Sequence, residues 1–197
     1  MNKIIDYYLS PMSPWTYLGH ARFQAIAKKH GASIQVKPVD VGRIFPVSGG
    51  LPVSKRPPQR QAYRLVELTR WSGFLGVPLN LHPKFFPYDA QLATHVILAA
   101  DSSDAAMRLT GAMLSGCWKD EKNMADEKEI ERAIRQCGTD PGALLSRARS
   151  PEIAARYEAL NEEAIARQVF GVPTYVYRDE LFWGQDRLEF LDRALGG

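Results

Sequence analysis

Hydrophobic and polar positions along the first forty residues predict a strand, a helix and a second strand. Residues 4–9 form a short β-branched and aromatic run that is typical of a buried strand, and residues 33–39 alternate between apolar and polar side chains. Between them, residues 15–29 carry apolar side chains at helical spacing, and Ser13 and Pro14 form a favourable cap and first turn. This order predicts a parallel β-α-β unit with a right-handed crossover.

The rest of the chain is predicted to be a long loop, a block of helices and a terminal hairpin. Glycine and proline dominate residues 40–58, which predicts a loop whose length makes it either mobile or part of a site. Helical periodicity follows at 59–75, 89–100, 105–118, 127–137, 141–147 and 151–168. Strands are predicted at 174–177 and 181–183, joined by a turn at 178–180, before a last helix at 188–195. The terminal segments can therefore form one mixed sheet, with most of the helices inserted between them.

Composition and charge narrow the class of protein. With 197 residues, 45% of them hydrophobic and 24% charged, the chain can bury a sizeable core. A net charge of +3, spread along the chain, does not predict a nucleic-acid partner. No run of eighteen apolar residues occurs, and Asp6 interrupts the first apolar segment, so neither a membrane span nor a signal peptide is expected. Cys117 and Cys137 form no Cys-x-x-Cys motif, which predicts reduced thiols and a cytoplasmic location.

Three short segments could carry chemistry, and each also has a purely structural interpretation. Ser13 opens Ser-Pro-Trp-Thr at a helix start, where free N–H groups favour an anion, but it could simply be a cap. Val172 and Pro173 lie in Phe-Gly-Val-Pro-Thr; if their peptide bond is cis, Val172 turns its N–H and C=O outward and could pair with an extended ligand. Asp186, in Trp-Gly-Gln-Asp-Arg, could cap the last helix or accept a hydrogen bond from a ligand ammonium.

Other common catalytic patterns are absent from the sequence. The histidines, at positions 20, 30, 82 and 95, have no metal-ligand spacing with one another or with the two cysteines, so no metal site is expected. The chain contains no phosphate-binding loop, no dinucleotide fingerprint and no Gly-x-Ser-x-Gly elbow. These absences argue against a kinase, a dehydrogenase and an α/β-hydrolase.

Taken together and in this order, the three segments resemble the thioredoxin-fold family with an all-helical insertion. That family includes DsbA-like oxidoreductases, kappa-class glutathione transferases and 2-hydroxychromene-2-carboxylate isomerase, and the resemblance is strongest to the isomerase branch. It implies an α/β, thioredoxin-like fold in which residues 1–58 and 150–197 form the thioredoxin-like domain and residues 59–149 the helical insertion. It also implies a homodimer with glutathione as cofactor, which interconverts 2-hydroxychromene-2-carboxylate and trans-o-hydroxybenzylidenepyruvate or acts on a related aromatic carboxylate.

The resemblance implies a catalytic role for Ser13. DsbA-like enzymes carry Cys-Pro-x-Cys where this chain has Ser-Pro-Trp-Thr, so disulfide exchange, which needs a thiolate pair, is not expected. In the isomerase and kappa branches the first position is a serine that contacts the sulfur of bound glutathione. Ser10 is the alternative, because Ser10-Pro11-Met12-Ser13 also matches Ser-Pro-x-Ser; the longer pattern through Gly19 and the distance from Asp6 favour Ser13.

The same resemblance assigns further contacts. In the family the residue before the cis-proline pairs with the cysteinyl part of glutathione, and the γ-glutamyl end is held by the segment before the last helix. These contacts correspond here to Val172, Pro173, Trp183, Gly184, Gln185 and Asp186. Kappa enzymes add a long-loop asparagine and lysine; no asparagine lies between positions 40 and 58, and Lys55, Arg56 or Arg60 could supply the positive charge. The residues near the isomerase's substrate-contacting segments are Ile44, Phe45, Phe85 and Phe86.

The implied mechanism is reversible addition of the glutathione thiolate to a conjugated carbon. Ser13 and the helix N-terminus would stabilise the thiolate, the ring would open, a former double bond would rotate, and the thiolate would leave. Two alternatives stay open. One is a kappa-like glutathione transferase or peroxidase, which consumes the thiol, and the other is a thioredoxin-fold binding module without catalysis.

Overall fold

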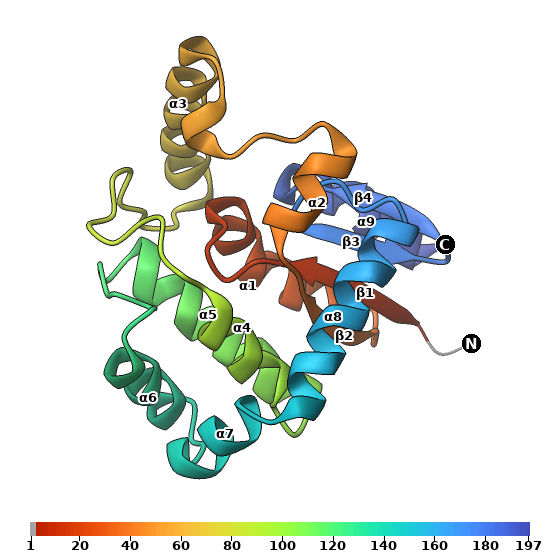
Figure 1. Ribbon diagram of the computed structural model, residues 1–197. Helices are drawn as coiled ribbons and strands as arrows, with labels where there is room; N and C mark the ends of the chain where they lie inside the picture. The colour runs from red at the N-terminus through yellow and green to blue at the C-terminus, as the bar shows by residue number, and fades with distance from the viewer. Residues whose placement is uncertain (1–2) are drawn as a thin grey trace.

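The strands form one mixed sheet in the order β2-β1-β3-β4 (Figure 1). In the computed structural model, which describes residues 3–197, β1 (Ile4–Leu9) pairs in parallel with β2 (Ser33–Pro38). On its other side β1 pairs antiparallel with β3 (Thr174–Tyr177), which forms a hairpin with β4 (Glu180–Trp183). The predicted α/β class and the joining of the two chain ends in one sheet are therefore confirmed.

Helix α1 (Pro14–Lys29) makes the crossover between the two parallel strands. Ser13 caps its first turn and Pro14 occupies the first helical position, where no N–H is needed. Gly31, with a φ of 60°, lets the chain turn back into β2. The predicted strand, helix and strand are thus confirmed to within a residue at each end.

The two faces of the sheet bury different sets of side chains. Alternate residues of β1 point to opposite faces, so Ile5, Tyr7 and Leu9 join a large core with α1, while Tyr8 joins a smaller core on the other face. The last helix, α9 (Leu188–Gly196), contributes to the large core, and α8 (Pro151–Ala166) covers the smaller one, crossing in front of the strands in Figure 1.

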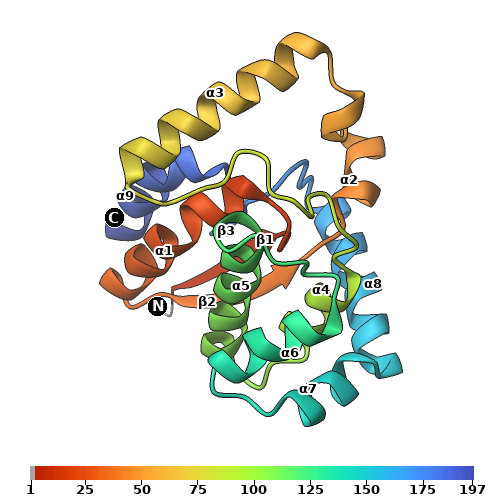
Figure 2. The ribbon, with the colours of Figure 1, turned by 90° about the vertical axis from the view of Figure 1, so that its left-hand side faces the viewer.

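The remaining helices form a layer on the α1 side and an arm above it. Helix α3 (Pro58–Leu75) contacts α1 and lies above it in Figure 2. The helices that follow are α4 (Gln91–Leu98), α5 (Ser103–Trp118), α6 (Glu127–Gln136) and α7 (Pro141–Ala148). Side chains of α4, α5, α6 and α7 belong to the same large core as β1, so the helical layer and the sheet share one hydrophobic interior.

The prediction of a loop over residues 40–58 is wrong for its first half, which forms helix α2 (Val41–Ser48). Asp40 caps this helix by accepting a hydrogen bond from the Gly42 N–H at 2.7 Å, and Gly49 ends it with a φ of 76°. A short 3-10 turn, η1 (Val53–Lys55), follows. Two of the glycines that suggested a loop therefore belong to the ends of a helix: Gly42 to its capped start and Gly49 to its end. Burial of Ile44 holds this helix against the rest of the protein.

The second correction is small. The terminal hairpin turns on two residues, Arg178 and Asp179, both at positive φ, and Glu180 already belongs to β4. Two positive φ values match the right-handed twist of the flanking strands, which makes a two-residue turn sufficient. The predicted three-residue turn is therefore one residue too long.

Candidate active site

The three segments singled out from the sequence meet at one end of the sheet. Tyr8 of β1 lies opposite Thr174 of β3, so the chain that leaves β1 runs beside the chain that enters β3. Thr174 also lies opposite Trp183, and the Gly184 N–H donates to the Pro173 carbonyl at 2.8 Å. We call the group formed by Ser13, Val172–Pro173 and Gly184–Asp186 the sheet-end site.

Ser13 is buried at the cap of α1, with donors to spare. Its Oγ accepts a hydrogen bond from the Thr16 N–H at 3.2 Å, and its carbonyl accepts from Tyr17 at 3.0 Å. The hydroxyl proton of Ser13 remains free to donate. Within residues 3–197, the Trp15 N–H also makes no hydrogen bond to the protein. Two donors at the positive end of a helix form a site suited to an anion.

Ser10 lies in a different environment. It follows β1 in the turn before the helix, and its Oγ accepts only a long hydrogen bond, 3.4 Å, from the Met12 N–H. Its carbonyl accepts from the Ser13 N–H at 3.0 Å. Ser10 therefore stabilises the turn that precedes Ser13. Of the two serines, only Ser13 has its hydroxyl at the N-terminus of α1.

The Val172–Pro173 peptide bond is cis. Among the described residues, neither the N–H nor the C=O of Val172 pairs with the protein, whereas the Pro173 carbonyl is already taken by Gly184. Thr174 fixes the start of β3 by donating its hydroxyl proton to the Gly171 carbonyl at 2.7 Å. Val172 thus keeps a donor and an acceptor available for a ligand backbone, which is the pairing expected of strand addition.

Gly184 and Trp183 hold the neighbouring turn in place. Gly184 has a φ of 94°, and a Cβ there would lie 2.4 Å from an Asp186 carboxylate oxygen. The indole of Trp183 lies over Gly171, where a Cβ would come within 2.6 Å of its nitrogen, and packs against the Phe170 ring at 4.8 Å. Trp183 is half exposed, so this aromatic pair borders the sheet-end site.

Gln185 faces inward and Asp186 outward. The Gln185 side chain is 1% exposed; it packs against Gly19 of α1, and its oxygen accepts from the Arg22 guanidinium at 3.1 Å. What Gln185 can offer a ligand is therefore its backbone. Asp186 is exposed and pairs with Arg187 at 2.7 Å, a contact that an incoming ammonium group could replace.

The candidate substrate-contacting residues fall into two places. Ile44 is fully buried beneath α2 beside Tyr8 and Val39, so the half-buried Phe45 is the member of that pair with accessible surface. Phe85 and Phe86 are half buried in the segment between α3 and α4. Ile44 belongs to the smaller core and Phe86 packs against the larger one, so these two residues line different parts of the molecule.

The Phe86 segment is tied directly to the turn before Ser13. Tyr88 donates its hydroxyl proton to the Pro11 carbonyl at 3.0 Å, and its N–H approaches the Met12 sulfur at 3.4 Å. The second peptide bond found in the cis form is Phe86–Pro87. The segment that carries Phe86 is therefore connected, through the Tyr88–Pro11 hydrogen bond, to the turn that precedes Ser13.

Arg64 is a residue that sequence reasoning missed. It projects from α3 and is only 9% exposed, with its guanidinium 5.6 Å from the Phe86 ring centre and 5.9 Å from that of Trp118. We call Arg64, Phe86 and Trp118 the arginine–aromatic cluster. Its partners lie more than twenty residues apart in the sequence, so no local motif could have revealed it.

The two cysteines lie away from the sheet-end site and are poor nucleophiles. Burial raises the pKa of the Cys117 thiol to about 12, and it also raises the pKa of Cys137. A thiol with a raised pKa carries almost no thiolate at neutral pH. The chain therefore offers no redox pair of its own where the site lies.

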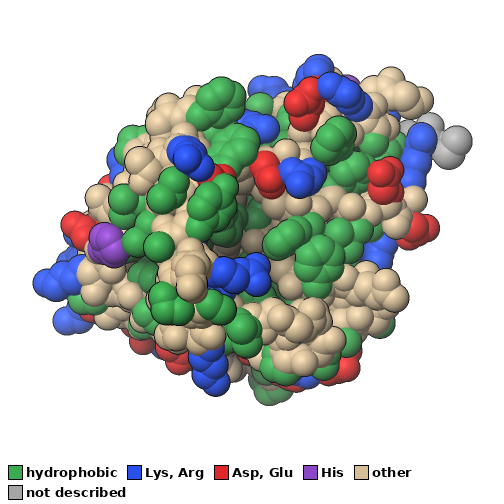
Figure 3. Space-filling view, turned by 90° about the horizontal axis from the view of Figure 1, so that it is seen from above, with side chains coloured by type: hydrophobic (Ala, Val, Ile, Leu, Met, Phe, Trp, Pro, Cys, Tyr) green, Lys and Arg blue, Asp and Glu red, His purple; other side chains and the backbone are tan. Residues whose placement is uncertain are grey.

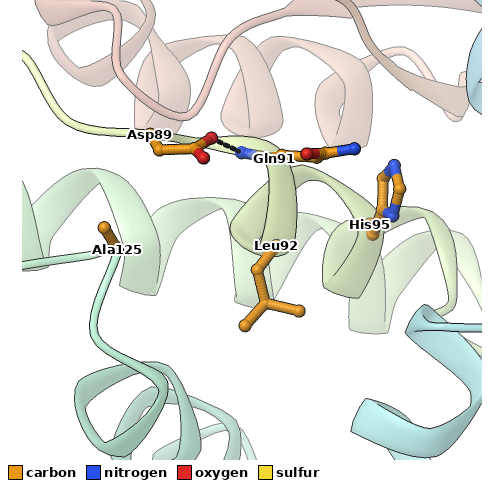
Figure 4. A pocket seen from close by; sticks show the side chains of 5 residues that line it. All are labelled: Asp89, Gln91, Leu92, His95 and Ala125. Atoms are coloured by element: carbon orange, nitrogen blue, oxygen red, sulfur yellow. Dashed lines mark hydrogen bonds between the residues drawn. The ribbon is translucent and has the colours of Figure 1, made fainter.

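Two cavities are found among the described residues, and one of them borders the sheet-end site. One, of about 460 Å³, is bordered by Phe170, Trp183 and Arg187 on the outer side of β4. Another, of about 260 Å³, lies at the start of α4; Figure 4 shows Asp89, Gln91 and His95 along its edge, with the Gln91 N–H donating to Asp89 at 2.9 Å. The face seen in Figure 3 is hollowed near its middle, and hydrophobic and basic side chains border the hollow.

Two kinds of feature are absent from the described residues. From residue 3 to residue 197, no three histidine, cysteine or acidic side chains are grouped closely enough to hold a metal ion. Over the same stretch, every helix is too short or too polar to cross a bilayer.

Comparison with known proteins assigns the chain to a family. A family model of the DSBA-like thioredoxin domain matches residues 4–196, so the chain belongs to that family. Within it, the chain is 31% identical over 201 residues to a 2-hydroxychromene-2-carboxylate isomerase from Pseudomonas sp. (strain C18), covering 98% of this chain and 91% of the relative. It is 29% identical to the protein of the same name from Sphingobium xenophagum, with 99% of each chain covered. Because these relatives match almost the whole chain, the chain is an isomerase, as the resemblance of its sequence motifs implies.

Solved structures agree with this assignment. The structure of a 2-hydroxychromene-2-carboxylate isomerase superposes with a TM-score of 0.85 at 27% identity, covering 98% of this chain and 94% of that one. A cytosolic disulfide reductase, DsbM from Pseudomonas aeruginosa, superposes with a TM-score of 0.70 at 15% identity, covering 98% of each chain. The second likeness is one of fold alone.

Proposed function

We propose that the protein is a glutathione-dependent isomerase that interconverts 2-hydroxychromene-2-carboxylate and trans-o-hydroxybenzylidenepyruvate, or a closely related aromatic carboxylate. The observation that carries the proposal is the buried Ser13 hydroxyl at the cap of α1, free to donate and without a cysteine beside it. The substrate is that of the relatives named above. An aromatic acid also suits the aromatic rings and the unpaired arginine near the site.

The sheet-end site provides donors and acceptors that fit glutathione. The Val172 N–H and C=O are the free backbone pair that the cysteinyl unit of a peptide would match. The Gln185 and Asp186 N–H groups, which make no hydrogen bond within the described chain, suit the γ-glutamyl carboxylate, and the Asp186 carboxylate suits its ammonium group. These residues would hold the tripeptide with its sulfur toward Ser13.

When bound, glutathione supplies a thiolate that adds to the conjugated substrate and leaves again, which permits rotation about a former double bond and regenerates the cofactor. Ser13 assists by donating its hydroxyl proton in a hydrogen bond to the sulfur, while Thr16 holds the Ser13 oxygen in place from behind. The helix terminus adds its partial positive charge. A free thiol has a pKa near 8.5, so lowering it by about one unit, worth about 1.4 kcal/mol, raises the thiolate fraction at neutral pH roughly eightfold.

The remaining residues of this chain shape the space for the substrate. Trp183 and Phe170 border one side of the sheet-end site, and the half-buried Phe45, Phe85 and Phe86 would supply further aromatic surface to the substrate. Such rings favour a planar, conjugated substrate and exclude water from the developing charge. Cys117 and Cys137 take no part, because burial raises the pKa of both thiols.

The experiment that tests the proposal follows substrate and glutathione together. Purified protein is incubated with 2-hydroxychromene-2-carboxylate, with and without glutathione, and both are quantified by liquid chromatography, while calorimetry measures glutathione binding. We expect saturable binding, conversion that requires glutathione, and full recovery of glutathione. Conversion at an equal rate without glutathione would contradict the cofactor, and stoichiometric loss of glutathione would identify a transferase instead.

A further inference from the structure

Arg64 stands out among the arginines of the described chain. Of the other fifteen, nine form ion pairs with acidic side chains, at positions 43, 70, 132, 135, 147, 149, 167, 187 and 193, and six form none within the described residues, at positions 22, 56, 60, 108, 156 and 178, but none of those six is buried. Arg64 is the most deeply buried of these charges, and between residues 3 and 197 no carboxylate lies within ion-pair distance of it. Burying a charge without a partner is costly, so this arrangement is expected where a ligand provides the partner.

Two N–H donors, one on Arg64 and one beside it, lack a partner within the described residues. The Arg64 Nη2 is fully buried and, within the described residues, makes no hydrogen bond; the buried indole N–H of Trp118 also has no partner. Arg56 lies close enough to lower the pKa of Arg64 further, so the local field is doubly positive. Burial is the main cause of a pKa of about 10, which still leaves the guanidinium charged at neutral pH.

The flat surfaces beside the charge are aromatic. Phe86 packs against Trp118 with ring centres 4.9 Å apart, and both rings lie under the Arg64 guanidinium. A guanidinium held over aromatic rings spends none of its N–H groups on them, so those groups can still match a carboxylate. The cluster also connects to the sheet-end site, because Tyr88 links the Phe86 segment to Pro11 just before Ser13.

We propose that Arg64, with Arg56 beside it, is the residue that binds the carboxylate of a planar aromatic acid whose ring lies along the Phe85–Phe86 segment. The inference rests on the proposed function, since it names the contact that selects the acid. The carboxylate could also be the glycyl carboxylate of glutathione, and the test separates these two sources.

The test uses trans-cinnamate as the probe acid and cinnamamide as its uncharged isostere. Binding of each is measured by calorimetry to the full-length protein in the presence of S-methylglutathione, which cannot react. The variants are Arg64→Met, which keeps the length and apolar packing of the side chain, and Arg64→Lys, which keeps the charge. The matched control is Arg70→Met on the same helix, because Arg70 is exposed and already paired with Glu67.

We expect Arg64→Met to weaken cinnamate binding by about 10- to 100-fold, the range for losing charge-assisted hydrogen bonds. Arg64→Lys should lose less, and Arg70→Met should not change binding. Cinnamamide should bind weakly to all four proteins, and the affinity for S-methylglutathione should stay the same. The melting temperature of Arg64→Met should be equal to or above that of the wild type, since an unpaired buried charge is removed.

Three results would overturn the inference. They are equal cinnamate affinity in wild type and Arg64→Met, equal loss of cinnamamide and cinnamate binding, and loss of S-methylglutathione affinity in Arg64→Met with cinnamate binding unchanged. Failure of the proposed function looks different, because the wild-type protein would then bind no glutathione at all. In that case the cinnamate arm, repeated without S-methylglutathione, still tests Arg64.

Discussion

The sheet-end site and the arginine–aromatic cluster are built in contrasting ways. The sheet-end site consists of short segments whose backbone supplies most of the polar groups: the cap at Ser13, the open pair at Val172 and the turn at Gly184. The arginine–aromatic cluster consists of side chains from α3, α5 and the segment between α3 and α4. Backbone recognition suits a constant peptide-like cofactor, whereas a side-chain cluster can be changed by single substitutions to suit a different acid.

The largest effect is expected at Ser13. In Ser13→Ala the substrate turnover number should fall by about 100-fold, the usual loss when one donor to a developing anion is removed. The pH–rate profile should also move to higher pH, because the thiol loses a hydrogen bond that stabilises its charged form. Measuring kcat between pH 6 and 9 checks both.

Two further serine variants complete this test. Ser13→Thr keeps the hydroxyl and should retain most activity, and Ser10→Ala should remain close to wild type because Ser10 only supports the turn. If Ser10→Ala were inactive and Ser13→Ala active, the catalytic role would belong to Ser10. The description of the sheet-end site as centred on Ser13 would then be wrong.

The next effect concerns His20, which connects α1 to α5 through the Met107 carbonyl. Helix α1 begins at the sheet-end site, and α5 carries Trp118 of the arginine–aromatic cluster. The His20 Nε2 lies 3.0 Å from the Met107 carbonyl, which can only accept, so Nε2 carries the proton, while Nδ1 accepts from the Tyr7 hydroxyl at 3.2 Å. Burial lowers the pKa of His20 to about 4. The folded protein therefore holds this ring neutral where the unfolded chain, with a pKa near 6.5, would take up a proton.

The sign of the resulting pH dependence follows from proton uptake. Between about pH 6.5 and pH 4 the unfolded state binds more protons, so the stability contributed by neutral His20 is complete above pH 6.5 and is lost as pH falls toward 4. The loss is about 3 kcal/mol at most. Urea denaturation of His20→Gln across this window should show a shallower decline than wild type. The exposed His82→Gln is the control and should lose stability with falling pH as the wild type does. If His20→Gln did the same, His20 would not cause the pH dependence.

A smaller effect is expected at Gly184. In Gly184→Ala the new methyl group meets both an unfavourable φ and the Asp186 carboxylate, so we expect a loss of about 1–3 kcal/mol in unfolding free energy and weaker glutathione binding. Gly138→Ala is the matched control, because Gly138 has a φ of 75° but open space around it. If both variants lose equal stability and neither loses affinity, the close contact at the sheet-end site has no functional consequence.

The smallest effect is expected from the thiols of the helical layer. Cys117, whose pKa burial raises to about 12, should react with a disulfide reagent at pH 8 far more slowly than the same thiol in denaturant. Insulin reduction by the native protein should stay at background. Rapid labelling of native Cys117, with Cys137→Ser as the background, would mean that the helical layer opens readily.

Local patterns predicted the structural elements around the sheet-end site well, and helix α2 and the burial of Arg64 poorly. The cap at Ser13 and the hairpin before the last helix follow from residues that act on their immediate neighbours, so a few letters suffice to place them. Helix α2 was missed because its proline and glycines are also typical of loops, and only burial of Ile44 against α8 decides for the helix. Arg64 was missed because its burial depends on Phe86 and Trp118, which only the folded chain brings near.

The Tyr88 hydroxyl joins the wall of the arginine–aromatic cluster to the backbone just ahead of Ser13. A change of side chain that re-shapes the arginine–aromatic cluster is therefore expected also to shift the Ser13 hydroxyl, which we propose activates the sulfur. We therefore expect a variant selected for a different acid to show an altered turnover number, and a variant selected for faster turnover to show altered acid preference.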